Sequence, residues 1–401
     1  MHLAMVSPFP PTLTGISQYG YYNSRSLVQT ESFERISVLT NSAVFPAKGD
    51  IARQICLEQA WRPQDLRTAG KILRRLRSLS PDVVWFNLGA SIFGSSILAN
   101  LAGFFIPGMV RAMGYPTVVT LHELIELADL PALNAPGGSF ARFGAGLLTR
   151  LAAQADVVCL TLAEYVKWFG LHHPGPKTVH IPIGAYQSPE LLPESQPAYL
   201  LFFTSLAPFK GLEVLMEAFH VLRQHYPQLN LVVAGAPHPR FPAYTEALRK
   251  NHEQRPGVHW LGVVPQEEVK NLFAHAQMAV LPYKASTGSS SVLFQTAMWG
   301  RPVVASDLAG MRTAAAESGL EVGFFKNGDV ASLIQAICRL LENPGLGRQQ
   351  ATNNLRAIQR HGPEQIARRY VKAFNLAIQN HCPEEGRPDL GDEFPGYGLG
   401  R

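Results

Sequence analysis

Residues 281–306, LPYKASTGSSSVLFQTAMWGRPVVAS, combine features that suit the binding of a phosphate group. A strand at the start of the segment is followed by a loop rich in Ser, Thr and Gly, and then by a predicted short helix over 291–299. Gly300 ends that helix, and a second strand is expected over 302–305. A small-residue loop that enters a helix N-terminus presents unpaired N–H groups and the positive end of the helix dipole. The segment therefore predicts a phosphate or diphosphate site, with an ordinary strand-to-helix turn as the alternative interpretation.

Two side chains outside this segment could serve the same chemistry. Lys210, in the run Ala-Pro-Phe-Lys-Gly, lies at the predicted start of a helix over 211–225. A lysine there opposes the helix dipole, so a bound anion explains it better than solvent does. His122 follows the apolar strand 117–121, and ligands of open α/β sheets bind at the carboxyl ends of parallel strands. Both positions therefore predict contact with a bound ligand; loop side chains without a role are the alternative.

The elements that would position these residues alternate between short apolar runs and amphipathic stretches, which is typical of parallel sheets covered by helices. In the first half the expected strands are 2–7, 35–40, 82–87, 116–121, 156–162 and 178–183, and the expected helices are 16–29, 65–79, 92–112 and 139–154. In the second half the expected strands are 199–204, 229–234, 258–261, 277–282 and 302–305, and the expected helices are 211–225, 241–252, 266–275, 290–299 and 329–342. A long helix is expected over 364–379. The pattern predicts an α/β protein.

Length and charge narrow the class of protein. The chain has 401 residues, and single cores rarely grow beyond about 250–300 residues, so two domains are expected. A net charge of +5 favours acidic partners such as nucleotide diphosphates or anionic lipid head groups. No nucleic-acid recognition motif accompanies that charge, so nucleic acid is not a predicted partner.

The cysteines and apolar segments bear on location. Four scattered cysteines without a CxxC pair predict neither a disulfide framework nor a zinc site, and they favour the reducing cytoplasm. The first six residues are too short for a secretory signal. The most apolar window, 88–110, is interrupted by glycines and prolines, so a membrane-spanning helix is not expected; a segment that dips into a membrane is the alternative.

Taken in chain order, a series of short motifs resembles retaining nucleotide-sugar glycosyltransferases of the GT-B type, in family 4, also called group 1. The resemblance covers about residues 1–380 and depends on the order and spacing of the motifs together. The matching residues are Ser7-Pro8-Phe9-Pro10-Pro11 with Gly15, Pro81-Asp82-Val83-Val84, Thr120-Leu121-His122-Glu123, Ile181-Pro182 with Gly184, Pro208 with Lys210-Gly211-Leu212, Val232-Val233-Ala234-Gly235, Leu261-Gly262 with Val264-Pro265, the 281–306 segment, and Gly328-Asp329.

The resemblance implies two Rossmann-like domains that face each other across a cleft. The expected division is an N-terminal acceptor-binding domain (1–186), a linker (187–198), a C-terminal domain that binds the nucleotide sugar (199–362), a helix that crosses back to the N-terminal domain (363–381), and a disordered tail (382–401). The implied reaction transfers a hexose from a nucleoside-diphosphate sugar to a hydroxyl acceptor with retention. Neither a cofactor nor a metal is implied, and the acceptor and its binding residues are unassigned.

Site residues follow by matching the family motifs one by one. Lys210 matches the lysine that contacts the donor diphosphate, and His122 matches a histidine near the sugar; both are expected to be catalytic. Gly15 matches a glycine that lets the backbone approach a ligand closely. The remaining expected donor-binding residues are Ser205, Gly235, Lys284, Thr287, Gly288, Ser289, Ser290 and Gln295.

Three of these positions depart from the family pattern. Ser205 stands where relatives usually carry an arginine, and Lys284 is a candidate replacement for that charge. Thr287 and Gln295 stand where relatives usually carry two glutamates that contact the donor sugar and the ribose. Gln295 can still accept a hydrogen bond from a ribose hydroxyl, although without charge assistance.

Alternatives to a transferase remain open at this point. The same fold is used by nucleotide-sugar epimerases and by phosphorylases, and the departures at Ser205, Thr287 and Gln295 would also suit a non-catalytic binding subunit. The basic stretch 66–77, with Leu and Ile at helical spacing, suits either a surface helix or peripheral contact with the inner face of a membrane.

Overall fold

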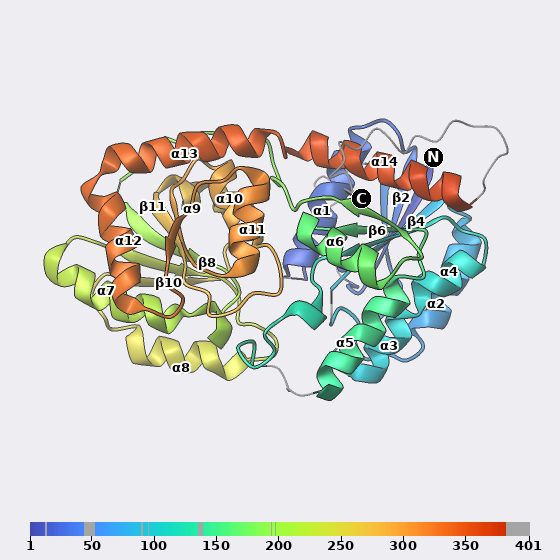
Figure 1. Cartoon of the computed structure of the whole chain (residues 1–401), viewed down its shortest axis with the longest axis horizontal. Coiled ribbons are helices and arrows are strands. Elements are labelled where there is room, and N and C mark those ends of the chain that lie inside the picture. Colours follow the sequence, from blue (N-terminus) through green and yellow to red (C-terminus); the bar gives the residue numbers. More distant parts are fainter. Residues whose placement is uncertain are drawn as a thin grey trace.

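The computed structural model describes residues 1–12, 14–43, 53–89, 91–94, 96–134, 139–193, 195–196 and 198–381. Within these residues the strands form two sheets, one in each half of the chain (Figure 1). The first sheet has seven strands in the order β3-β2-β1-β4-β5-β6-β7, and the second has six in the order β10-β9-β8-β11-β12-β13. Neighbouring strands in both are parallel, as in β1 with β4 and β8 with β11. The predicted α/β architecture of two Rossmann-like sheets is confirmed.

The central strands of the first sheet have side chains buried on both faces. Its strands are β1 His2–Val6, β2 Arg35–Thr40, β3 Ile55–Gln59, β4 Val83–Leu88, β5 Thr117–Leu121, β6 Val157–Leu160 and β7 Lys177–His180. Its helices are α1 Gly15–Val28, α2 Thr68–Leu79, α3 Ile97–Phe104, α4 Ile106–Ala112, α5 Ser139–Ala152 and α6 Ala163–His172. Every residue of β4 and β5 is buried, which is expected for central parallel strands covered by helices on both faces.

The second sheet repeats this plan. Its strands are β8 Tyr199–Phe203, β9 Leu231–Ala234, β10 Val258–Gly262, β11 Ala276–Leu281, β12 Val303–Ser306 and β13 Gly323–Phe325. Its helices are α7 Leu212–His225, α8 Pro242–His252, α9 Val269–Ala274, α10 Ser291–Met298, α11 Ala309–Ser318, α12 Val330–Glu342 and α13 Pro344–Gln359. Short 3-10 helices are η2 Ile125–Leu127, η3 Pro208–Lys210 and η4 Gln266–Glu268.

Several elements differ from the sequence prediction. The helix expected over 92–112 is two helices, α3 and α4, because Pro107 lacks an N–H and begins a new helix after Phe105. Strands β3 and β13 and helices α6, α11 and α13 were not predicted. Strand β3 is a partly exposed edge strand, and β13 has only three residues. Helix α11 is rich in alanine, so it lacks the apolar periodicity that marks an amphipathic helix.

The last helix, α14 Pro363–His381, returns to the first sheet. Figure 1 shows α13 over the second sheet and α14, the next helix along the chain, over the first. Tyr370 and Phe374 of α14 are fully buried, and the rings of both lie within 6 Å of the Trp85 ring on β4, at 4.5 and 5.7 Å. Helix α14 therefore contributes core side chains to the first sheet. The residues 382–401, for which disorder is expected, lie outside the described residues.

The two halves of the chain also contact each other directly, along a boundary that is called the seam below. An apolar cluster joins Ala128, Leu130 and Leu133 of the first half to Ala207 and Phe209 of the second. On the other side of this seam, the Glu317 carboxylate of α11 accepts hydrogen bonds from the backbone N–H groups of Ala163 (2.9 Å) and Glu164 (3.3 Å). Helix α6 has no side-chain cap from its own N-cap residue, so a side chain of the other half satisfies its N-terminus.

Candidate active site between the two sheets

The loop from Ser286 to Ser290 leads directly into helix α10. Its N-cap, Ser290, makes no side-chain capping bond to the helix. Instead the Ser286 hydroxyl bonds the Gly288 carbonyl at 2.7 Å, and the Ser289 Oγ atom is buried without a hydrogen-bond partner in the described part of the chain. Free N–H groups at a helix N-terminus together with an unpartnered hydroxyl can bind a phosphate. The geometry suits the phosphate chemistry expected for this segment.

This loop lies against the first half of the chain. The Tyr165 hydroxyl of α6 donates to the Thr287 carbonyl at 2.9 Å. A β-carbon added to Gly288 would lie 2.7 Å from the His122 carbonyl oxygen, and one added to Gly15 would lie 3.9 Å from Ser291 Oγ. Glycine at 288 is therefore required by close approach of the two backbones. The sequence placed Gly15, Gly288 and His122 in one site. All three lie where the two halves of the chain meet.

Lys210 stands beside the same loop. Its Nζ atom lies 3.8 Å from the centre of the Tyr283 ring and 5.7 Å from that of Phe209. The backbone holds these segments together, because the Lys284 N–H donates to the Phe209 carbonyl at 2.8 Å. An ammonium over an aromatic face is stabilised by the ring quadrupole. The positive charge is thus held next to the loop that leads into α10.

His122 follows β5 at the carboxyl end of the first sheet. Its Nε2 atom lies 2.6 Å from Asn87 Oδ1, and the Tyr19 ring packs edge-on against the imidazole with ring centres 4.7 Å apart. Burial lowers the pKa of His122 to about 4. The imidazole is therefore neutral at neutral pH, so it does not supply a positive charge to a bound diphosphate.

The other expected donor-site residues lie on the second half, around the carboxyl ends of its strands. Lys284 Nζ is exposed and lies 3.7 Å from a Glu213 carboxylate oxygen. The Glu213 carboxylate therefore already neutralises part of the Lys284 charge that was expected to replace the missing arginine. Ser205 lies two residues beyond β8 and is half-buried. A β-carbon at Gly235 would lie 1.8 Å from the Thr204 carbonyl oxygen, so glycine there allows the ends of β8 and β9 to approach each other.

Gln295 and Thr287 occupy different environments. Gln295 lies on α10 and is only 6% exposed, so a carboxylate at this position would be poorly solvated. Thr287 is half-buried in the loop, where its carbonyl oxygen accepts the hydrogen bond from Tyr165. The structure leaves the expected ribose contact of Gln295 as a prediction.

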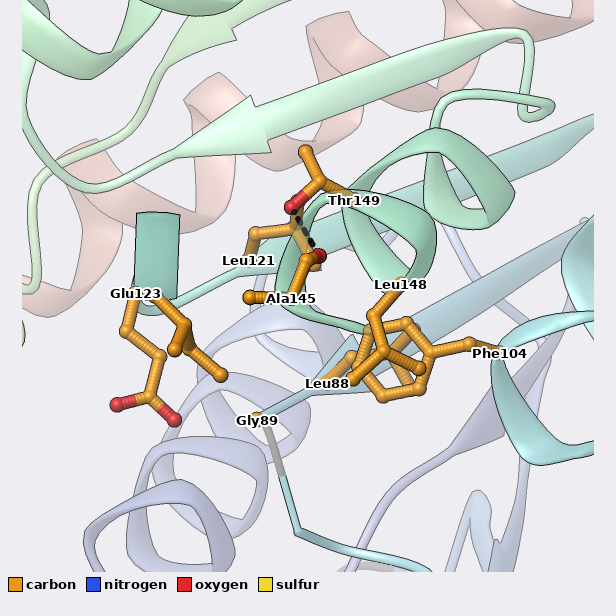
Figure 2. A pocket seen from close by; sticks show the side chains of 9 residues that line it. Leu88, Gly89, Phe104, Leu121, Glu123, Ala145, Leu148 and Thr149 are labelled. Carbon is orange, nitrogen blue, oxygen red and sulfur yellow. Dashed lines mark hydrogen bonds between the residues drawn. The ribbon is translucent and has the colours of Figure 1, made fainter. Parts of the chain in front are cut away.

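A small cavity lies in the first half, next to His122. It measures about 10 Å³, which is close to the least volume that holds one water molecule. Figure 2 shows the side chains of Leu88, Phe104 and Leu148 on one side of it and the carboxylate of Glu123 on the other. The cavity lies where β4 and β5 end, beside Leu88 and Leu121.

Some residues of this site were not predicted from the sequence. Asn87, Tyr19 and Tyr165 surround His122 and the Thr287 loop through contacts between distant segments. Tyr283 directly follows the expected strand 277–282, and its ring lies 3.8 Å from the Lys210 ammonium. A tyrosine directly after an apolar strand was the one local signal, since strand ends in parallel sheets face ligands.

The second half of the chain is similar to a known protein family. Residues 197–343 match the family model described as glycosyl transferases group 1. This part of the chain, about a third of its length, is therefore similar to the group 1 glycosyltransferases. The matched residues include Lys210, the Ser286–Ser290 loop and α10, so this part of the candidate site lies within the region typical of the group 1 family.

Relatives with curated descriptions align over part of their length. A phosphatidyl-myo-inositol mannosyltransferase of Propionibacterium freudenreichii is 28% identical over 180 residues, which cover 45% of this chain and 43% of that protein. A D-inositol 3-phosphate glycosyltransferase of Corynebacterium efficiens is 32% identical over 148 residues, covering 35% and 34%. The chain thus spans less than half the length of these curated relatives.

Solved structures share the fold over nearly the whole chain. Anabaena Alr3699/HepE in complex with UDP-glucose superposes with a TM-score of 0.70 at 18% identity, over 94% of this chain and 99% of that one. WaaG, a glycosyltransferase of lipopolysaccharide biosynthesis, superposes with a TM-score of 0.67 at 15% identity, over 94% and 99%. The chain therefore has the GT-B fold that the sequence predicted.

Among the described residues, no group of three or more His, Cys, Asp or Glu side chains could hold a metal ion. None of the helices in the same residues is long and apolar enough to cross a membrane.

Proposed function

We propose that this protein transfers a hexose from a nucleoside-diphosphate sugar to a hydroxyl acceptor with retention of configuration. The second half of the chain would bind the nucleotide and the first half the acceptor. One observation carries the proposal: the Lys210 ammonium and the uncapped N-terminus of α10 lie on one side of the seam, and His122 lies on the other. A diphosphate suits the first side, and a sugar between the two would contact both.

In the proposed reaction the bond between the anomeric carbon and the diphosphate oxygen breaks. The acceptor oxygen bonds to the anomeric carbon on the same face, and its proton passes to the departing diphosphate. The main demand on the protein is to stabilise the charge that develops on the leaving group. Lys210 and the N–H groups of α10 are suited to this task, and no metal is required for it. Closure of the seam would exclude water from the reacting atoms.

Structures of similar fold support a uracil nucleotide as the donor. HepE was solved with UDP-glucose, and its fold matches this chain over almost the full length. We propose a UDP-hexose as the donor for this protein. The alternatives are an epimerase of the same fold and a subunit that binds a nucleotide sugar without reacting. Thr287 in place of a carboxylate disfavours the epimerase, because acid and base groups would be needed in the cleft.

A membrane surface or a lipid-linked acceptor is the proposed partner of the first half. Helices α2 to α5 gather at one end of the molecule (Figure 1). Ile97 of α3 and Phe143 of α5 are 73% and 71% exposed there, and α2 carries the basic residues of the stretch 66–77. Exposed apolar side chains next to cationic ones are typical of contact with anionic lipid.

The first experiment is a thermal-shift panel of UDP-, GDP- and ADP-sugars, followed by transfer and hydrolysis assays with the sugar that stabilises most. Stabilisation by one UDP-sugar together with release of UDP supports the transferase. Binding without turnover, with any hydroxyl acceptor or water, would favour the non-catalytic subunit. Stabilisation by none of the three would contradict both proposals.

Replacement of Gln295 by glutamate tests the expected ribose contact. A charged acceptor makes hydrogen bonds roughly twice as strong as a neutral one, so Gln295→Glu should tighten ribonucleotide binding by about 1 kcal/mol. A 2′-deoxynucleotide should gain less. Because Gln295 is buried, the same change should lower the melting temperature of the empty protein. Titration calorimetry with both nucleotides is the measurement, and equal affinities for wild type, Gln295→Glu and Gln295→Ala would place the ribose elsewhere.

Replacement of Lys284 tests whether it supplies the charge that Ser205 lacks. If it does, Lys284→Ala should weaken the affinity for a nucleoside diphosphate and leave that for the nucleoside unchanged. Glu213→Gln is the matched control, since it frees the Lys284 ammonium from its ion pair at 3.7 Å and should strengthen diphosphate binding. No change in diphosphate affinity in either variant would remove Lys284 from the site.

A further inference from the structure

We propose that Asn87 is a positioning residue that holds His122 in the tautomer with its proton on Nε2, so that Nδ1 accepts a hydrogen bond from a substrate hydroxyl. The part of this inference that concerns the substrate rests on the proposed function. The tautomer is a property of the protein alone and can be measured without any substrate.

The orientation of the Asn87 amide follows from its partners. Asn87 is fully buried near the end of β4, between Phe86 and Leu88, and a buried amide needs hydrogen bonds. One side-chain atom lies 3.0 Å from the Ile16 carbonyl oxygen. A carbonyl only accepts, so that atom is the amide nitrogen Nδ2.

A second contact requires the same orientation. Asn87 Nδ2 also lies 2.9 Å from Ser7 Oγ, and Ser7 Oγ lies 2.7 Å from the Pro8 carbonyl oxygen. The hydroxyl proton of Ser7 is used on that carbonyl, so Ser7 Oγ accepts from Asn87. Both hydrogens of the amide nitrogen are therefore engaged, one by Ser7 and one by Ile16. The oxygen Oδ1 is left on the side of His122.

The proton position on His122 follows directly. Its Nε2 atom is 2.6 Å from Asn87 Oδ1, and an amide oxygen can only accept, so Nε2 must carry the proton. The edge-on Tyr19 ring restrains the imidazole, and the Tyr19 hydroxyl is itself bonded to Tyr370 at 2.7 Å. Burial lowers the pKa of His122 to about 4, so at neutral pH the second nitrogen, Nδ1, is unprotonated.

This arrangement determines what His122 can recognise. An unprotonated Nδ1 accepts from a hydroxyl, and it cannot donate to a phosphate oxygen. Within the described residues, Nδ1 has no hydrogen-bond partner. His122 and Lys210 would therefore contact different groups of the substrate. The neutral imidazole would bind a sugar or acceptor hydroxyl, and the ammonium would neutralise the diphosphate.

The direct experiment is ¹H–¹⁵N NMR of the ring nitrogens in the full chain labelled with ¹⁵N-histidine. The His122 signals are assigned by their loss in His122→Gln. At pH 7 we expect the coupling pattern of a neutral imidazole with Nε2–H. An Nδ1–H pattern or a doubly protonated ring would overturn the proposal, whatever the enzyme activity proves to be.

Variants of Asn87 test whether this residue causes the tautomer. Asn87→Leu removes the acceptor and should yield a mixture of tautomers, with kcat/KM lower by about tenfold, the effect of roughly one hydrogen bond. Asn100→Leu is the matched control, since Asn100 is a buried amide in the same half of the chain, on helix α3, whose side-chain nitrogen bonds the carbonyls of Gly94 and Ser96. It should lower stability and leave the His122 signals unchanged. An unchanged Nε2–H pattern in Asn87→Leu would overturn the role of Asn87.

Asn87→Asp supplies a second readout if the leucine variant does not fold. A carboxylate beside Nε2 raises the pKa of His122, and protonation then removes Nδ1 as an acceptor. We expect kcat/KM to fall as the pH drops through that raised pKa, whereas the wild type stays flat between about pH 5 and 8 for this group. Burial raises the pKa of the neighbouring Tyr19 hydroxyl well above its usual range, so Tyr19 does not titrate in this window. A wild-type pH profile in Asn87→Asp, with an unchanged His122 titration, would count against the proposal.

Discussion

Lys210→Ala should lower turnover by about 100-fold or more, because removal of one group that stabilises a developing negative charge costs that much in comparable sites. The lysine ammonium is held 3.8 Å from the centre of the Tyr283 ring, beside the loop that enters α10. Its long side chain is therefore already ordered before a ligand binds. Initial rates with a UDP-sugar, measured at saturating acceptor, are the test.

The control for Lys210 is Lys250→Ala, which removes an exposed lysine from the last turn of α8 in the same half of the chain. It should leave turnover unchanged. Affinity for UDP should fall in Lys210→Ala and stay constant in Lys250→Ala. A folded Lys210→Ala protein with the wild-type rate would remove Lys210 from the chemistry, even if the protein proves to be a transferase.

Phe374→Ala should destabilise the first half of the chain by about 3–5 kcal/mol, the usual cost of deleting a fully buried phenylalanine. Its ring lies 5.7 Å from Trp85 of β4 and 5.8 Å from Phe33, measured between ring centres. Hydrogen exchange should become faster in β4 and β5, and the melting temperature should fall. Protection of the second sheet should change little.

Arg368→Ala on the same helix is the comparison for Phe374. Arg368 is exposed and pairs with Glu364 one turn away, and such surface changes usually stay within about ±0.5 kcal/mol. If Phe374→Ala melted like Arg368→Ala, α14 would not be part of the core of the first sheet.

The fold was predictable wherever one element carried its own signal. The buried strands β1, β4, β5 and β8 are short, mostly apolar runs, and this composition and length predicted them as strands. The edge strand β3 and the alanine-rich α11 lack such a pattern, because their stability depends on neighbours that a single segment does not reveal. The division into α3 and α4 was readable at Pro107, yet the apolar run across it favoured one helix.

The candidate site was predictable to the extent that its residues follow strands or begin helices. Lys210, His122 and the Ser286–Ser290 loop were found in this way. Asn87 was not, because an asparagine inside an apolar strand acquires a role only when Ser7 and Ile16, from distant turns of the chain, orient its amide. Glu317 is similar: its carboxylate caps α6 from another part of the sequence, and no local motif marks that contact.

The return of α14 to the first sheet has a consequence for how the protein is made. During synthesis on the ribosome, N-terminal domains generally fold first. Here Tyr370 and Phe374, which fill space beside Trp85 and Phe33, emerge only after the whole second sheet has been translated. Until then the nascent first half exposes the apolar surface that α14 later covers. The first half therefore completes its core only when the last helix has been synthesised.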